Sequence, residues 1–202
     1  MIFSRTVPLR LSRTYRDYQP QFRKDFLNRC AYCLRHEFHF GGEANGQIDH
    51  FCPAAVFNRT GQHHLSYTYA NLFWSCAECN NTKRESWPNA AELARGLRFV
   101  DATQEDTDDH WKVSATGEIK ALTPAGEYTI DTILLWRDDL VRWRCAIIEA
   151  WQRIERLKEK IDDPSLTAED RTEFHEQMRR DILFVSPHPF DRTHKKQPLR
   201  SF

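Results

Sequence analysis

The spacing of hydrophobic residues changes along the chain, and in the first half it predicts short elements separated by turns. Phe22 and Phe26 lie four residues apart, as on one face of a helix. Pro88 cannot continue a helix, so it marks the end of the last one in this half. The expected elements, in chain order, are helical turns over residues 21–29, a strand over 47–51, a loop over 52–69, a strand over 71–74 and a helix over 75–87.

In the second half the pattern predicts hairpins followed by two long helices. Turn glycines stand between short β-prone runs such as 127–130, so one or two hairpins are expected within residues 111–133. Over residues 138–161 apolar side chains recur at helical spacing, which predicts a long amphipathic helix. A second helix is expected to open at a cap over Thr167–Asp170. Its apolar stripe would consist of Phe174, Met178 and Ile182.

These elements predict an α+β protein whose two parts pack as one unit. Residues 1–98 would form a basic N-terminal arm and a strand and helix core, and residues 99–202 an extension of hairpins and two amphipathic helices. The length of 202 residues is enough for one core with an appendage, or for two small domains that share an interface. The basic tail after Pro187 is expected to be held loosely.

Composition predicts where in the cell the protein resides, and its charged residues are distributed unevenly along the chain. No run approaches the roughly 20 apolar residues of a membrane span, and the N-terminus lacks the long apolar segment of a signal peptide. We therefore expect a cytoplasmic protein without membrane association. The net charge is zero, yet residues 1–35 carry eight basic against two acidic side chains, and residues 101–135 carry the reverse. A basic face for nucleic acid and ordinary solvated surface are both open at this point.

Two C-x-x-C pairs carry the strongest chemical signal. The pairs are Cys30 with Cys33 and Cys76 with Cys79. In a reducing compartment, cysteines at this spacing are typical metal ligands, and four thiolates form a closed tetrahedral zinc site with a structural role. Redox-active pairs would need a thioredoxin-like βαβ context, which the pattern lacks. The remaining cysteines, Cys52 and Cys145, are expected to be small buried side chains.

A second group of polar residues lies between and just after the cysteine pairs. Hydrolysis of a phosphodiester needs a base that activates water and oxygen ligands that hold a partly open divalent cation. His50 can act as the base, while Asp49 and Asn80 offer oxygen ligands of the kind that Mg²⁺ and Mn²⁺ prefer. Lys83 and Arg84 follow Asn80 closely, so they are either phosphate contacts or an exposed helix end.

This pattern resembles the HNH endonucleases, also called ββα-metal or His-Me finger nucleases. The match covers residues 30–83: C-x-x-C, Asp-His with Pro three residues after the His, Asn-Leu, then C-x-x-C-Asn-x-x-Lys. The resemblance implies a ββα-metal core in which Asp49 and Asn80 bind the catalytic metal, and in which His50 is the general base. It also implies that Asn71 braces the loop holding His50. Many zinc-knuckle members have His where Asn80 stands, and an all-oxygen set favours Mg²⁺ or Mn²⁺.

The second half contains the segments Arg98–Asp101, Asp109–Trp111, Gly117–Ile119 and Thr123–Gly126, followed by a Leu-rich helix with Arg137 and Arg144. In these segments it is similar, more diffusely, to the C-terminal part of HNH proteins from bacterial anti-phage defence systems of the Septu and retron-linked types. That similarity implies an effector endonuclease, with DNA as the favoured substrate and RNA as the other, working beside an SMC-like ATPase. The acidic stretch 105–109 and the long helix over 138–161 are candidate interfaces for such a partner. The alternative function is a non-catalytic zinc-knuckle module that binds nucleic acid or a protein.

Overall fold

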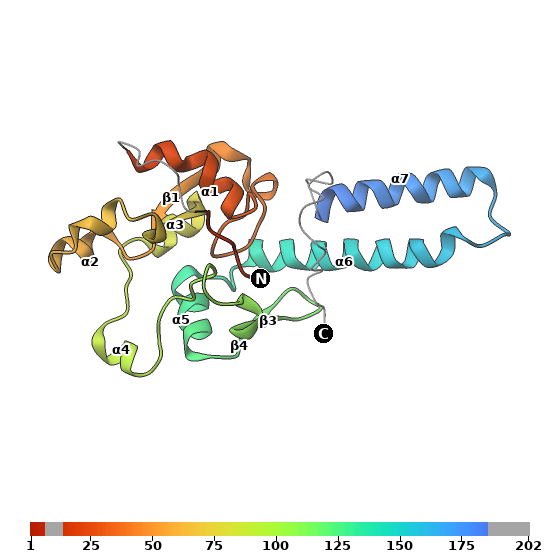
Figure 1. Cartoon of the computed structure of the whole chain (residues 1–202). Coiled ribbons are helices and arrows are strands. Elements are labelled where there is room, and N and C mark those ends of the chain that lie inside the picture. Colours follow the sequence, from red (N-terminus) through yellow and green to blue (C-terminus); the bar gives the residue numbers. More distant parts are fainter. Residues whose placement is uncertain (7–13, 186–202) are drawn as a thin grey trace. The chain divides into compact units, whose positions relative to one another are not determined.

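The computed structural model describes residues 1–6 and 14–185, whose contacts divide the chain into two compact units (Figure 1). Of the described residues, the first unit comprises 1–6, 14–112 and 119–136, and the second comprises 113–118 and 137–185. Helices and two small sheets build the protein, which confirms the α+β class. Residues 99–112 and 119–136, expected in a C-terminal extension, cluster with the N-terminal residues.

The centre of the first unit is a strand, strand and helix arrangement. Strand β1 (Gly46–His50) pairs antiparallel with β2 (Leu72–Cys76), and helix α3 (Ala77–Lys83) follows β2 directly. Both strands lie within two residues of their expected positions. Trp74 of β2 is fully buried, and a Cβ added at Gly46 would overlap its indole ring. Glycine is therefore required where β1 begins.

Aromatic rings fill the space around these strands. Helix α1 (Gln19–Asp25) and the residue after it bury Phe22 and Phe26, as their spacing predicted. Phe73 of β2 stacks on Phe51, with ring centroids 4.5 Å apart. The guanidinium of Arg5 lies 4.6 Å from the centroid of Phe73 and donates to two backbone carbonyl oxygens at 2.8 and 3.0 Å. The N-terminal segment is thus fixed to this core by a buried cation.

The prediction of a loop over residues 52–69 is wrong, because this stretch contains helix α2 (Ala54–Arg59) and a 3₁₀ turn (His63–Ser66). Pro53 lies just before α2 in an extended conformation, and Phe57 is buried. A proline at the helix start and one apolar anchor are enough to order a helix this short within a packed unit.

Helix α3 is shorter than the helix expected over residues 75–87. It ends at Lys83 because Arg84 adopts a φ of 48°, in the region that interrupts a right-handed helix. The amide of Ser86 donates to the carbonyl of Lys83 at 2.9 Å, which closes a turn there. A further helix, α4 (Ala90–Ala94), was not expected, although Asn89 and Glu92 form the capping box that signals its start.

Residues 111–133 contain one hairpin and one helix. Strands β3 (Trp111–Val113) and β4 (Ile119–Ala121) form the hairpin, and α5 (Pro124–Ile133) occupies the run that was expected to be β-prone. The β expectation for 127–130 is wrong because Thr123 caps the helix, its Oγ1 accepting from the amide of Gly126 at 3.0 Å. A Cβ at Gly126 would overlap the backbone of His110, so glycine permits this close packing.

The second unit contains the two longest helices, α6 (Asp138–Ile161) and α7 (Ala168–Val185), which lie side by side (Figure 1). Helix α6 confirms the predicted periodicity, whereas α7 confirms only part of its expected stripe, because Met178 and Ile182 pack against the core and Phe174 is not among the residues that do. Thr167 and Asp170 form the expected cap, because the Thr167 hydroxyl donates to the Asp170 carboxylate at 2.6 Å and accepts from its amide at 3.1 Å. The buried contacts between the helices come from Ile147, Ala150, Ile154 and Val185, with Met178 and Ile182 packed against them.

The tail after Pro187, predicted to be loose, lies outside the described residues. Within residues 1–6 and 14–185, no helix combines the length and the apolar character needed to cross a membrane.

An ion pair between a part-exposed arginine and a buried carboxylate joins α6 to α7 and leads to a stability prediction. Arg153 donates to the buried carboxylate of Asp181 at 2.8 and 3.1 Å. This hydrogen bond lowers the pKa of Asp181, so the pair stabilises the fold above the ordinary Asp pKa and loses its effect as the pH falls through the lowered value. We expect Asp181→Asn to reduce the free energy of unfolding by about 1 kcal/mol at neutral pH, given the exposure of Arg153.

Urea unfolding at neutral and at acidic pH measures this difference. The loss in free energy of unfolding caused by Asp181→Asn should be smaller in acid. The exposed control Glu176→Gln should change the free energy of unfolding little at either pH. A loss of the same size at both pH values would contradict the role assigned to the pair.

Candidate zinc knuckle and active site

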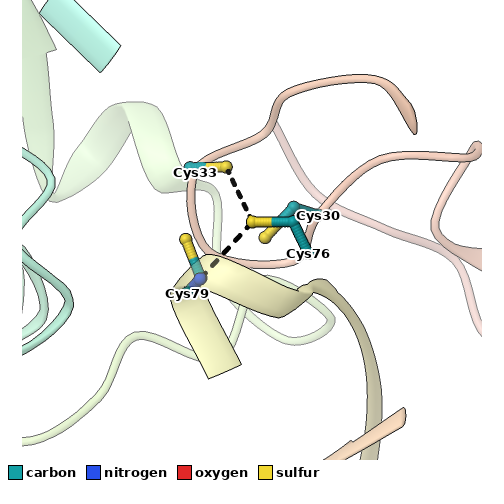
Figure 2. A group of neighbouring side chains, drawn as sticks. All are labelled: Cys30, Cys33, Cys76 and Cys79. Carbon is teal, nitrogen blue, oxygen red and sulfur yellow. Dashed lines mark hydrogen bonds between the residues drawn. The ribbon is translucent and has the colours of Figure 1, made fainter. Parts of the chain in front are cut away.

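The four cysteines of the C-x-x-C pairs meet in one buried cluster (Figure 2). Their sulfur atoms lie within 4.8 Å of one another, and Cys33 Sγ is 3.9 Å from Cys76 Sγ. Thiolates around one zinc ion, each at about 2.3 Å, lie about 3.8 Å apart, whereas a disulfide bond is about 2.05 Å long. The cluster therefore fits a single metal ion such as zinc and does not fit two disulfides.

Each cysteine pair is held by its local backbone. The first pair lies in a turn closed by the bridge between Arg29 and His36, and the amide of Ala31 donates to the carbonyl of Trp74 on β2 at 2.8 Å. Cys76 ends β2 and caps α3, its sulfur accepting from the amide of Cys79 at 3.5 Å (Figure 2). A metal ion at the cluster would thus link the turn to the junction of strand and helix.

A buried cation lies beside the cluster. Burial alone would lower the pKa of Arg35, but the charge of the neighbouring Cys33 thiolate and a hydrogen bond to it raise that pKa. The guanidinium also donates to Glu78 at 2.8 Å. Four thiolates around a divalent ion leave excess negative charge, which Arg35 partly neutralises.

Zinc content tests the cluster directly. We expect the purified protein to hold about one zinc ion per chain, and Cys76→Ser to lose most of it, because three thiolates bind zinc far more weakly than four. Cys145→Ser is the matched control, since Cys145 belongs to the second unit and is not one of the four clustered cysteines. Elemental analysis measures both variants, and full zinc content in Cys76→Ser would contradict the assignment.

His50 is the last residue of β1, and its half-buried imidazole is oriented by its neighbours. The rings of Tyr15 and Phe57 pack edge-on against it at centroid distances of 5.3 and 5.6 Å. Its Nε2 lies 3.2 Å from the carbonyl oxygen of Ser66, which can only accept, so Nε2 carries the proton. The neutral ring then presents its lone pair on Nδ1, which has no hydrogen-bond partner among the residues described.

Asn71 holds two chain segments that adjoin this histidine, one at Cys52 and one at Leu65. Its Oδ1 accepts from the amide of Cys52 at 2.7 Å, and its Nδ2 donates to the carbonyls of Cys52 at 3.2 Å and Leu65 at 3.1 Å. Cys52 follows His50 by two residues, and Leu65 precedes the serine that holds the imidazole. The buried amide therefore fixes both segments around His50, which is the position expected for it.

Asp49 and Lys83 form a buried ion pair. Lys83 Nζ lies 3.0 Å from Asp49 Oδ2 and donates to the carbonyl of His50 at 2.8 Å, while the hydroxyl of Tyr32 donates to the same carboxylate. Burial raises the pKa of Asp49 and lowers that of Lys83, and each partner opposes the shift of the other. Lys83 is 0% exposed. The expected phosphate contact of Lys83 is therefore wrong, because its ammonium is enclosed within the unit.

The two ligands expected for a catalytic metal have separate partners. Asn80 Nδ2 donates to Gln47 Oε1 at 2.6 Å, whereas the carboxylate of Asp49 is engaged by Tyr32 and Lys83. Asp49 is only 5% exposed. The buried and paired carboxylate of Asp49 therefore does not fit an open Mg²⁺ or Mn²⁺ site, whereas the contact of Asn80 involves its amide nitrogen and leaves Oδ1 available. Arg84 remains exposed at the end of α3.

No family model, curated protein or solved structure matches this chain.

Many of the charged side chains that make the sequence asymmetric form contacts within the first unit. Four of the eight basic residues in the N-terminal stretch contact other groups of that unit: Arg5, Arg23, Arg29 and Arg35. Arg10 and Arg13 lie outside the described residues. In the acidic stretch, Glu105 forms two hydrogen bonds of 2.6 Å with Arg98. These contacts weaken the expectation of a broad basic face for nucleic acid and of an acidic interface.

Sequence reasoning missed two residues that matter to this site. Tyr32, inside the first C-x-x-C pair, reaches Asp49, and its position between two cysteines was the one signal that could have drawn attention to it. Ser66 holds His50 through its backbone carbonyl. Any residue type supplies that carbonyl, so no pattern of side chains could have revealed it.

Proposed function

We propose that this chain is an HNH-type endonuclease in which His50 activates water for hydrolysis of a phosphodiester. The observation that carries the proposal is the oriented imidazole, with Nε2–H directed to Ser66 and Nδ1 left as the basic nitrogen. Support comes from the strand, strand and helix arrangement of β1, β2 and α3 around a four-cysteine cluster. The resemblance of the motif extends over the same residues.

In the proposed reaction, Nδ1 of His50 accepts a proton from water as the water oxygen forms a bond to phosphorus. The ester bond on the opposite side breaks, and the leaving oxygen departs with its electron pair. The resulting imidazolium is stabilised by its hydrogen bond to the Ser66 carbonyl, because such a bond strengthens when the donor is charged. Asn71 keeps the supporting segments in place during this change.

The resemblance adds a divalent metal and a biological setting to the proposal. Mg²⁺ or Mn²⁺ would neutralise charge on the phosphate oxygens, but the buried carboxylate of Asp49 is paired with Lys83 and does not fit as a ligand of that ion. We propose DNA, with RNA as the other substrate, and a role as the effector nuclease of an anti-phage system beside an SMC-like ATPase.

Replacing the base tests the proposal. We expect His50→Ala to lower cleavage of nucleic acid at least about 100-fold, because a positioned general base contributes that much or more. Zinc content and thermal unfolding should stay unchanged, since His50 is not a ligand of the cluster. Assays with single- and double-stranded DNA and RNA in Mg²⁺ and Mn²⁺ measure the effect. His175→Ala, an exposed histidine of the second unit, is the control, and full activity in His50→Ala would overturn the proposal.

One observation favours a second function, that of a non-catalytic zinc-knuckle module. The buried pairing of Asp49 with Lys83 suits a site that holds no catalytic metal. Such a module would bind nucleic acid or a protein without Mg²⁺ and would cleave no substrate. Co-expression with the product of the adjacent gene separates this function from a nuclease that needs an ATPase partner, because only the nuclease would then cleave.

A further inference from the structure

A fully buried lysine in a unit of this size calls for a physical reason. An ammonium group removed from water is strongly unfavourable unless charged and polar partners surround it. Lys83 has the Asp49 carboxylate at 3.0 Å, the His50 carbonyl at 2.8 Å and the ring of Phe99 5.6 Å from its nitrogen. The ammonium is therefore held by the two residues that the sequence placed at the centre of catalysis.

These contacts connect three elements. Tyr32 lies in the turn of the first cysteine pair and donates to Asp49, on β1. Asp49 accepts from Lys83, the last residue of α3, and Lys83 donates to the backbone of His50. A hydrogen-bonded path thus runs from the cysteine turn to the residue that carries the base. Movement of the His50 carbonyl would move its imidazole, since both belong to one residue.

The same contacts bear on the role of Asp49. Its carboxylate is engaged by Tyr32 and Lys83 and is 5% exposed. To coordinate a metal ion, it would have to release Lys83, which would leave an unpaired ammonium in the interior.

We infer that Lys83 is a positioning residue that fixes His50 through its backbone carbonyl, and that Asp49 acts through Lys83 and not as a ligand of a catalytic metal. This inference rests on the proposed function, in which His50 is the base. The zinc knuckle then contributes to base geometry through Tyr32 as well as to folding.

A double-mutant cycle tests the inference, with Asp49→Asn, Lys83→Met and the double variant compared in the full chain. We expect each single change to lower kcat about 10- to 100-fold and to leave KM and the half-saturating Mg²⁺ concentration within about twofold. The double variant should be no slower than either single variant, because both substitutions break the same contact between Asp49 and Lys83. A rise of about tenfold or more in the half-saturating Mg²⁺ concentration for Asp49→Asn alone would make Asp49 a metal ligand and overturn the inference. Full activity in Lys83→Met would also overturn it.

Tyr32→Phe keeps the test decisive if the buried charge variants do not fold. It removes only a hydroxyl and retains the ring that packs at 6.3 Å from Phe73. We expect a several-fold lower kcat with full zinc content. Tyr69→Phe is the matched control, because it also removes a hydroxyl that donates to a carboxylate, that of Asp25, at 2.8 Å. Equal effects on kcat in the two variants would contradict a specific path to His50.

A spectroscopic measurement separates failure of this inference from failure of the proposed function. The ¹⁵N signals of the His50 imidazole report its tautomer whether or not the protein cleaves nucleic acid. In the zinc-loaded protein we expect the Nε2–H form, and in Tyr32→Phe or Lys83→Met a shift towards exchange between the two tautomers. An unchanged spectrum in a folded variant would overturn the positioning role, even in a protein without nuclease activity.

Discussion

The four-thiol cluster is the constraint on which the first unit depends. Strands β1 and β2 have five residues each and α3 has seven, lengths at which neither a two-stranded sheet nor a helix is stable alone. A zinc ion bound by four thiolates contributes about 10 kcal/mol or more to folding in small zinc domains. Because the ligands come from a turn and from the junction of β2 with α3, one ion would fix all of these short elements together.

The register of the two strands determines where His50, the candidate base, lies relative to the cysteine cluster. Gly46, at one end of β1, pairs with Cys76, and His50, at the other end, pairs with Leu72. The candidate base therefore lies a full strand away from the cysteine cluster, where it is half exposed and free of the thiolates. Asn71 and Lys83 supply the remaining restraints, the first on the segments around His50 and the second on its backbone. Folding and catalysis would share the scaffold but not the metal.

Features carried by local spacing were predictable from the sequence, and features created by tertiary contact were not. The two C-x-x-C pairs predicted the cysteine cluster. Apolar residues at helical spacing predicted α6 and α7. The composition of residues 127–130 favours a strand, but these residues form a helix because Thr123 caps its N-terminus. Lysine is usually exposed, and nothing on a seven-residue helix reveals that Lys83 is enclosed by partners distant in sequence. For the same reason the N-terminal basic run gave no sign that Arg5 and Arg35 are internal.

X-ray absorption at the zinc edge of the purified full chain tests the central claim most directly. It reports the number, type and distance of the atoms bound to the ion. A single shell of four sulfur atoms at about 2.3 Å is the result that the four-thiol cluster predicts. A shell that contains nitrogen or oxygen in place of sulfur, or a protein without zinc, would contradict it and would remove the scaffold on which His50 is placed.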